Sequence, residues 1–376
     1  MPLSSLEIFD FRVYQHVSLS LNPHLNLIVG NNASGKTSLL EAIYFLSTGK
    51  SFRSAAAASV LRGGAEKSVV TARIFGADEQ MHVGMAITKH EKKVSLGGIE
   101  TAKVSDIARL LPVLVISPDS HFSFMGAAKH RRSTLDWILF HVEPGFGEIF
   151  SRYNRALHQR NSTLRNGTSG KLLDSWDIEV ASLGEIIHQK RNIALSEIRR
   201  HYEAMIKNLV GIDDVSLEVI SGWNKEKKLV DCYRDDKERD MSRGFTHSGP
   251  HRNDLHILLG GKKSQDIASH GQNKLLISAL RLAQIACFKE MTGKKCSLLI
   301  DDLSAELDAE HRKKILNILR KIDVQVFITA TDLGQLDFDE WESHSVFHVE
   351  HGMIKKLEKS YKSATNTGSK VVNFPV

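Results

Sequence analysis

The chain has 376 residues, of which 41% are hydrophobic and 25% charged, which suits a globular protein of two or three domains. Its formal net charge of +6 and isoelectric point of about 9.0 permit an anionic partner such as DNA without requiring one. No apolar run approaches a membrane span, the opening residues lack the features of a secretion signal, and the three cysteines have neither disulfide nor zinc spacing. We therefore expect a cytoplasmic protein without a membrane partner.

The first 46 residues predict strands followed by a loop and a helix that would bind phosphate. Residues 6–11 and 17–21 alternate between apolar and polar side chains, and residues 25–29 form an apolar run. Residues 30–37 fit the pattern GxxxxGK[ST], and residues 38–46 have helical apolar spacing. Glycines let backbone N–H groups surround a phosphate, and the helix N-terminus adds its dipole. The expected nucleotide-binding residues are Gly30, Asn31, Asn32, Ala33, Ser34, Gly35, Lys36, Thr37 and Ser38.

Two side chains in this loop have specific roles in such a site. Lys36 would reach the β- and γ-phosphates, and the Thr37 hydroxyl would hold Mg²⁺. An ordinary glycine turn can match the pattern by chance, but the strand before the loop and the helix after it favour nucleotide binding.

Residues 68–116 predict short strands separated by turns, and the last of them, at 113–116, is expected to be buried. From residue 129 to about 210 the pattern becomes helical. Apolar residues between Trp176 and Leu209 recur at spacings of three, four or seven, which forms a heptad-like seam. An unbroken helix of this length would span roughly 50–60 Å. The seam fits either two helices of an ordinary bundle or a protruding antiparallel arm, and we favour the arm.

From residue 241 an α/β pattern returns, with helices expected at 272–291 and 309–321 and strands at 297–300 and 324–330. Two acids end the first of these strands. Asp301 would hold Mg²⁺ through its water shell, and Asp302 would polarise the attacking water. Such a pair can also cap the following helix, because Asp is a good N-cap, but the phosphate-binding loop upstream favours the metal role.

Residues 269–272, Ser-His-Gly-Gln, stand directly before the helix at 272–291, where a hydroxyl and a glycine can form an anion site. They fit the SxGQ signature of the ABC-type ATPases, in which it binds the γ-phosphate held by the opposite subunit. Ser269, Gly271 and Gln272 would then contact nucleotide. An N-cap serine with a turn glycine would look the same, but the position roughly thirty residues before the acidic strand favours the signature. Residues 304–308 resemble the D-loop of the same class.

Two elements that ABC-type ATPases usually carry have no clear counterpart. Residues 329–332 are Thr-Ala-Thr-Asp, without the switch histidine that usually follows the last strand, so Thr331 or Asp332 is the candidate substitute. Residues 117–119, Ser-Pro-Asp, occupy the position of the usual Q-loop glutamine.

Several blocks, in order, resemble the RecF family of bacterial recombination mediators, which are related to the SMC-type ATPases. Residues 9–14 resemble its NFRNY start, and residues 39–53 resemble the block after its phosphate loop. Residues 117–136 resemble its SPEDL…RRRFLD block, and residues 247–255 resemble its GPHRDDL element. The loop at 30–37 departs slightly from the common GENGQGKT, but both glycines, the lysine and the threonine are present.

The resemblance implies an α/β fold: an ABC-type, SMC-like P-loop ATPase head assembled from N- and C-terminal segments, with an inserted helical or short coiled-coil arm. The expected parts are an N-terminal ATPase half with a β-rich lobe (1–128), the arm (129–240), a C-terminal ATPase half (241–358) and a flexible tail (359–376). ATP and Mg²⁺ would be held between two copies, with Ser269 of each completing the other's site.

The resemblance also implies slow, DNA-stimulated ATP hydrolysis that acts as a switch. It further implies binding to double-stranded DNA and to gapped single-strand/double-strand junctions, within the nucleoid. RecR and RecO would be partners in loading RecA.

The densest basic region begins at residue 129. Its candidate DNA contacts, which would bind phosphates without distinguishing sequence, are Lys129, Arg131, Arg132, Arg152 and Arg155. Arg160, Arg165, Lys190, Arg191, Arg199 and Arg200 extend the region along the arm. Interspersed acids leave a plain solvated helix face as the alternative. His247 and His251 lack a third ligand at metal spacing, so we expect no structural metal.

Two other functions remain open at this point. A transporter's ATPase subunit would share the loop, the signature and the acidic strand, although the inserted arm and the acid pair argue against it. A structural DNA-binding protein with a degenerate nucleotide site is opposed by the intact Lys36, Thr37, Asp301 and Asp302.

Overall fold

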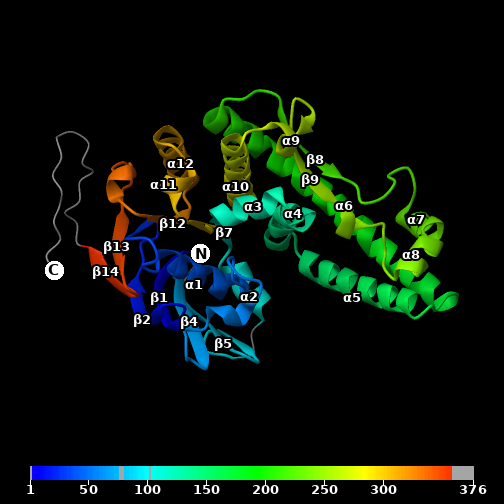
Figure 1. The fold of residues 1–376 in the computed structure, drawn as a ribbon, viewed down its shortest axis with the longest axis horizontal. Coiled ribbons are helices and arrows are strands. Elements are labelled where there is room, and N and C mark those ends of the chain that lie inside the picture. Colours follow the sequence, from blue (N-terminus) through cyan, green and yellow to red (C-terminus); the bar gives the residue numbers. More distant parts are fainter. Residues whose placement is uncertain (1, 76–79, 101–102, 358–376) are drawn as a thin grey trace. The chain divides into compact units, whose positions relative to one another are not determined.

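The computed structural model describes residues 2–75, 80–100 and 103–357. Its contacts divide the chain into two compact units, one formed by residues 1–118 and 295–376 and the other by residues 119–294. Figure 1 follows the chain in colour from the first unit (blue) through the second (green) and back to the first (orange and red). The tail expected at 359–376 lies outside the described residues.

The N- and C-terminal segments meet in a six-stranded sheet of the first unit, as the sequence predicts. Its strand order is β14-β13-β3-β12-β11-β7. The central strand β3 pairs in parallel with β12 on one side and β13 on the other. The four neighbouring strands β3, β12, β11 and β7 are buried along their whole length, as expected of parallel strands covered on both faces. The bounds are β3 Leu25–Val29, β7 Val113–Ile116, β11 Ser297–Ile300, β12 Gln325–Ala330, β13 His344–Glu350 and β14 Met353–Leu357.

One buried glutamine links the beginning of the chain to this sheet. The Gln325 side chain donates to the carbonyl oxygens of Leu3 and Asn22, each at 2.8 Å. Its Oε1 accepts from the Leu3 N–H at 2.8 Å and from the Ser297 hydroxyl at 3.1 Å. Three segments distant in sequence are therefore fixed at one amide.

The second sheet of the first unit is antiparallel, with strand order β2-β1-β4-β5-β6. Helix α1 (Lys36–Thr48) is buried on nearly all sides, and its apolar residues belong to the same core cluster as residues of both sheets. The glycine-rich loop is thereby attached to a rigid strand and a rigid helix. The other bounds are β1 Leu3–Phe11, β2 Tyr14–Ser20, β4 Lys67–Phe75, β5 Gln80–Thr88, β6 Lys92–Leu96, η1 Ala57–Val60, α2 Val104–Leu110, α11 Leu303–Glu306, α12 Ala309–Ile322 and η4 Leu333–Gln335.

The longest helix of the second unit is α6 (Lys171–Met205), with 35 residues. The nine apolar positions of the predicted seam are buried at seven sites and half-buried at Trp176 and Met205. The seven buried positions are Val180, Leu183, Ile187, Ala194, Ile198, Tyr202 and Leu209. The helix packs against α5 (Phe146–Arg165), as an antiparallel pair would, and also against α4, α7, α10 and β8. The predicted helical insertion is therefore confirmed, but α6 is one wall of a mixed unit rather than half of a bare two-helix arm.

The remainder of the second unit covers α6 on several sides. A three-stranded antiparallel sheet has the order β10-β9-β8. The bounds are α3 Pro118–Met125, α4 Ala128–Val142, the π-turn η2 Ile206–Val210, β8 Val215–Ile220, α7 Leu229–Asp235, α8 Lys237–Arg243, η3 Pro250–Arg252, β9 Asp254–Leu259, β10 Lys262–Lys263, α9 Ser264–Ile267 and α10 His270–Thr292.

The compact units do not coincide with the expected boundary at residue 241, because residues 241–294 pack with the second unit. A motif can serve an ATPase head while packing elsewhere, so the four-part scheme stays a prediction.

Within the described ranges, no helix combines the length and apolar character that crossing a membrane demands.

Candidate nucleotide site

The glycine-rich loop follows β3 and ends at Gly35, directly before α1. Gly30 and Gly35 have φ angles of 155° and 123°, in the region that side chains disfavour. A Cβ at Gly30 would lie 2.2 Å from the Val349 carbonyl oxygen, and one at Gly35 would lie 2.9 Å from the Tyr14 hydroxyl. Both glycines of the motif are therefore required by the fold itself, which explains why the loop can be so tightly curled.

Lys36 lies inside the curl of the loop. Its Nζ donates to the carbonyl oxygens of Gly30 and Asn31 at 2.6 and 2.9 Å. Burial lowers the pKa of Lys36, and the nearby carboxylates of Asp302 and Asp301 oppose that effect. A phosphate would offer this amine a charged acceptor in place of two neutral carbonyls, which makes a stronger hydrogen bond.

The Thr37 hydroxyl and the Asp301 carboxylate, predicted together as Mg²⁺ ligands, are in contact. Thr37 Oγ1 donates to Asp301 Oδ1 and Oδ2 at 2.9 and 3.0 Å. Strands β3, β12 and β11 are parallel neighbours, so their carboxyl ends bring residues 264 positions apart in sequence to one edge. Hydroxyl and carboxylate oxygens are the ligands that Mg²⁺ prefers.

Thr329, at the end of β12, orients both acids. Its Oγ1 donates to Asp301 Oδ1 at 2.8 Å and accepts from the backbone N–H of Asp302 at 2.7 Å. The second bond holds Asp302 in a left-handed conformation with φ of 54°. Asp302 Oδ1 also accepts from the Ser304 hydroxyl at 3.1 Å. Thr329 lies in the predicted switch segment, but no role could be assigned to it from the sequence, because a threonine near the end of a buried strand has no distinctive pattern.

The charge state of Asp301 depends on what occupies the site. Burial raises its pKa, the hydrogen bonds from Thr329 and Thr37 lower it, and the adjacent Asp302 raises it again. A buried carboxylate next to another acid is costly to ionise without a cation. The residues therefore fit a divalent metal chemically.

Two observations test the fit of a phosphate to the loop. Ser34 Oγ is buried without a hydrogen-bond partner among the described residues. Within the described ranges, the Lys36 amine donates only to carbonyls of its own loop. A phosphate oxygen would satisfy both groups, so the residues present fit a nucleotide.

A cluster of charged residues around α1 was not predicted from the sequence. Glu41 is fully buried and accepts two hydrogen bonds from Arg12, at 2.9 and 2.6 Å. Ser51 donates to the same carboxylate at 2.5 Å, and Arg53 lies 3.9 Å from it. The charge of Arg53 also lowers the pKa of Asp301. These residues fall in the blocks used for the family resemblance. The sequence signal for an ion pair was a single acid, Glu41, among the apolar residues of a predicted helix.

The signature segment forms the N-terminus of α10. Ser269 Oγ accepts from the Gln272 N–H at 3.2 Å, and Gln272 Oε1 accepts from the Ser269 N–H at 2.8 Å, which makes a capping box. Ser269 and Gly271 are exposed, and a Cβ at Gly271 would meet no atom within 4 Å. The capping function is therefore real, yet it does not account for the glycine.

Thr331 and Asp332, the candidate substitutes for a switch histidine, are both exposed. The Asp332 carboxylate accepts from the Gly334 N–H at 3.0 Å and so caps a short turn. Their nucleotide role stays a prediction.

The structure changes the set of basic residues available to DNA. Arg131 is only 7% exposed, and its guanidinium bonds both oxygens of Asp254 at 2.7 and 2.8 Å as well as the carbonyls of Phe124 and Gly126. Arg132 donates to the Asn253 carbonyl at 2.7 Å. Arg131 was therefore wrongly proposed as a DNA contact, and Arg132 is at best partly available.

Other arginines of the same basic region are also internal. Arg160 is fully buried against Asp177 and Asp240, and Arg191 is buried against Asp136. Among the proposed contacts, Lys129 and Arg155 are exposed, and Arg152 is exposed in an ion pair with Glu179.

His247 and His251 each have partners within the second unit. His247 Nδ1 lies 2.7 Å from Asp240, and His251 lies 2.7 Å from the Tyr153 hydroxyl and 3.1 Å from the Thr246 carbonyl. Over the described part of the chain, no group of three or more His, Cys, Asp or Glu side chains could hold a metal ion.

Comparisons with known proteins agree with this geometry. The family described as "RecF/RecN/SMC N terminal domain" matches residues 2–355. The "DNA replication and repair protein RecF" of Thioalkalivibrio sulfidiphilus (strain HL-EbGR7) is 37% identical over 94% of this chain and 99% of its own length. The protein with the same description from Vibrio vulnificus (strain CMCP6) is 36% identical over 95% of this chain and 100% of its own length.

Solved structures show the same likeness. A structure described as "the recombination mediator protein RecF-ATP in RecFOR pathway" superposes with a TM-score of 0.82 and 28% identity, covering 95% of this chain and 97% of the other. An Smc head domain from Pyrococcus furiosus gives a TM-score of 0.56 at 16% identity, covering 95% and 96%, and shows the shared ABC-type fold alone. On its phosphate loop, its acidic strand and these matches over nearly its whole length, the chain belongs to the RecF family of SMC-type ATPases.

Proposed function

We propose that the protein is an ATP-dependent DNA-repair factor that binds double-stranded and gapped DNA as an ATP-bound dimer. Hydrolysis would be slow and would return the dimer to monomers. RecR and RecO would be its partners in loading RecA at gaps, within the nucleoid. The contact of Thr37 with Asp301, beside the phosphate loop, is the observation that most supports a working nucleotide site.

Each residue of the site has a defined task in this mechanism. When bound, Mg²⁺ would neutralise charge on the phosphates. Lys36 would exchange its two carbonyl acceptors for phosphate oxygens, and Thr37 and Asp301 would hold the metal, Asp301 through its water shell. Asp302, fixed by Thr329 and Ser304, would accept hydrogen bonds from the attacking water.

The second half of each site would come from a second copy. Gly271 supports this step because it lies in the first turn of α10, where alanine is the better helix former. Nothing around it requires a glycine, since a Cβ there would meet open space. A close approach by another molecule would explain the glycine. Ser269 and Gly271 would thus place the positive end of α10 against the γ-phosphate of the partner's nucleotide.

Nucleotide-dependent dimerisation tests the composite site. Light scattering with a non-hydrolysable ATP analogue should show the wild type shifting from monomer to dimer. Gly271→Asp would set a carboxylate against the γ-phosphate and should remain monomeric and without ATPase activity. Ser175→Asp adds the same charge to the exposed face of α6 and serves as the control. Normal hydrolysis by a monomeric Gly271→Asp protein would overturn the composite site.

A second measurement tests the phosphate loop itself. DNA-stimulated hydrolysis should be lost in Lys36→Met, because the amine that neutralises the β- and γ-phosphates is removed. Unchanged activity in this variant would refute the assignment.

A third measurement tests DNA contact. Replacing Lys129 and Arg155 by alanine should weaken duplex binding and reduce its salt dependence.

A further inference from the structure

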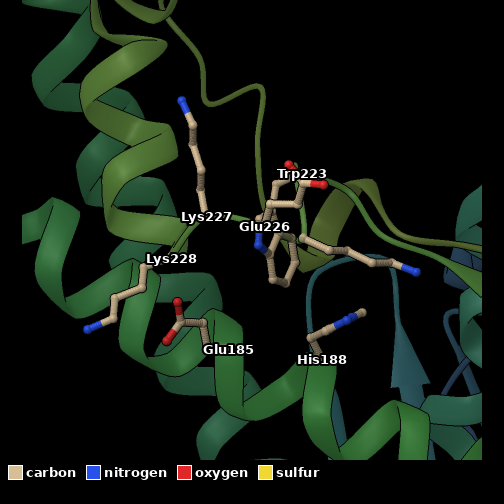
Figure 2. Close-up of a pocket in the computed structure, with 7 residues that line it drawn as sticks. Glu185, His188, Trp223, Glu226, Lys227 and Lys228 are labelled. Atoms are coloured by element: carbon tan, nitrogen blue, oxygen red, sulfur yellow. The ribbon is translucent and has the colours of Figure 1, made fainter.

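The second unit contains a pocket that the ATPase mechanism does not use. Its volume is about 390 Å³, within the range of small-ligand sites. Two residues of α6 and the loop that joins β8 to α7 form it (Figure 2). The lining residues are Glu185, His188, Trp223, Lys225, Glu226, Lys227 and Lys228.

Two aromatic rings in contact line part of this pocket and form an aromatic corner. The rings of Trp223 and His188 have centroids 4.7 Å apart at an interplanar angle of 64°. Figure 2 shows the Trp223 indole above the His188 imidazole. Trp223 is only half-buried although tryptophan is the largest apolar side chain, so part of its face is available to a ligand.

His188 has a polar atom that the fold leaves unsatisfied. Its Nε2 lies 3.1 Å from the Asn192 amide, whereas its buried Nδ1 makes no standard hydrogen bond with the described residues. Burial lowers the pKa of His188. A polar contact with Asn253 raises it, and the positive charges of Lys225 and Arg191 lower it again. The Asn253 Oδ1 is itself engaged by Arg191 at 3.0 Å. Because this Nδ1 is buried, the neutral ring contributes its contact with Trp223 to the pocket rather than a hydrogen bond to a ligand.

The lining of the pocket carries three lysines, Lys225, Lys227 and Lys228, and two glutamates, Glu185 and Glu226. Lys227 pairs with Asp235 at 2.6 Å, and Glu185 accepts from the Leu229 N–H at 2.8 Å. Lys225 and Lys228 form no ion pair with any described residue and are exposed. In Figure 2, Lys227 and Lys228 extend outward from the loop on the side away from His188, whereas the charge of Lys225 acts on His188. Lys225 and Lys228 thus add positive charge to the lining around the aromatic corner.

We propose that this pocket binds an unpaired nucleotide of single-stranded DNA, with the base on Trp223 and the adjacent phosphates near Lys225 and Lys228. An aromatic surface between basic side chains is how proteins hold single strands without distinguishing sequence. A base within a duplex cannot reach Trp223, so the pocket would recognise the single-stranded side of a gap. An acidic peptide would use the lysines but leave the tryptophan unused. The inference rests on the proposed DNA function and adds a location for gap recognition.

Binding of a fluorescently labelled oligothymidylate, without ATP, tests the pocket directly. Base stacking on an aromatic side chain contributes about 1–3 kcal/mol, so Trp223→Ala should bind roughly 5- to 150-fold more weakly. Trp223→Phe keeps a stacking surface and should retain most of the affinity. Lys225→Ala with Lys228→Ala should lower the slope of log affinity against log salt by about 1.4, at roughly 0.7 per phosphate contact. Lys262→Ala with Lys263→Ala removes the same charge from an exposed hairpin and should leave this binding unchanged.

The outcomes separate the pocket from the wider function. Equal oligothymidylate affinity for Trp223→Ala and the wild type would overturn the proposal, and so would displacement by polyglutamate as effective as by unlabelled oligothymidylate. Duplex binding with ATP should be the same in Trp223→Ala and the wild type, while the preference for gapped DNA is lost. If the wild type bound no duplex at all, the proposed function would fail, but the oligothymidylate result would still decide the pocket.

Discussion

Replacing Thr329 by valine should impair hydrolysis more than nucleotide binding. Valine has nearly the shape of threonine, so the change leaves no cavity, but it removes the bond to Asp301 at 2.8 Å and the acceptor for the Asp302 N–H at 2.7 Å. A hydrogen bond to a charged group is worth about 1.5–3 kcal/mol and a neutral one about 0.5–1.5 kcal/mol. We therefore expect a loss of about 2–4 kcal/mol in the unfolding free energy without nucleotide. The maximal ATPase rate should fall about 10- to 100-fold, as for other groups that orient metal ligands.

The same substitution should change the Mg²⁺ requirement in a pH-dependent way. The Thr329 hydrogen bond opposes the rise that burial causes in the pKa of Asp301. Without that bond the pKa rises further, and protons compete better with the metal as the pH falls. ATPase activity titrated with Mg²⁺ at two pH values should show a midpoint shifted to higher Mg²⁺ in Thr329→Val, and shifted more at the lower pH. Thr329→Ser keeps the hydroxyl and should behave like the wild type. If the valine variant matched the wild type in rate and in Mg²⁺ midpoint, Thr329 would have no positioning role.

Three further predictions concern the second unit. Arg160→Met would leave two buried carboxylates without their partner and should cost about 3–5 kcal/mol in urea unfolding, whereas Arg152→Ala should leave the unfolding midpoint unchanged. Burial lowers the pKa of His251 to about 4, so protons bind the unfolded chain more tightly. The wild type should lose up to about 3 kcal/mol of stability as the pH falls from about 6.5 to about 4, while His251→Gln should lose less; identical pH profiles would contradict this. Burial raises the pKa of the Cys287 thiol to about 11, so native protein at pH 8 should resist alkylation there until it unfolds, and rapid labelling would refute this burial.

The nucleotide site could be predicted from sequence because its residues occupy fixed positions in local motifs. Lys36 and Thr37 follow a strand within one loop, and Asp301 ends a strand that is apolar throughout. Parallel strands bring such ends together, so the contact of Thr37 with Asp301 could be expected even though 264 residues separate them. Thr329 could not be found in this way, because a single hydroxyl at the end of a strand carries no pattern of its own.

The basic region shows what sequence does not reveal. Arg131 and Arg160 have the same charge and helical spacing as exposed arginines, yet the acid partner of Arg131 lies 123 residues away and those of Arg160 lie 17 and 80 residues away. A charged side chain is buried when a partner meets it in the fold, and that partner cannot be chosen from many candidate acids along the chain. The aromatic pocket at Trp223 was missed for a related reason, because its two walls come from segments that no motif connects.

The strand order around β3, which the Gln325 amide helps to fix, has a consequence for how the protein folds during synthesis. The strands that flank β3 on both sides are encoded more than 290 residues downstream of it. During synthesis on the ribosome, a nascent chain carrying β3 and the phosphate loop would therefore have unpaired strand edges until nearly all of the described chain has emerged. Messages truncated before Gln325 should yield products with no functional head at all, and such products would be substrates for chaperones and proteases rather than weakened versions of the protein.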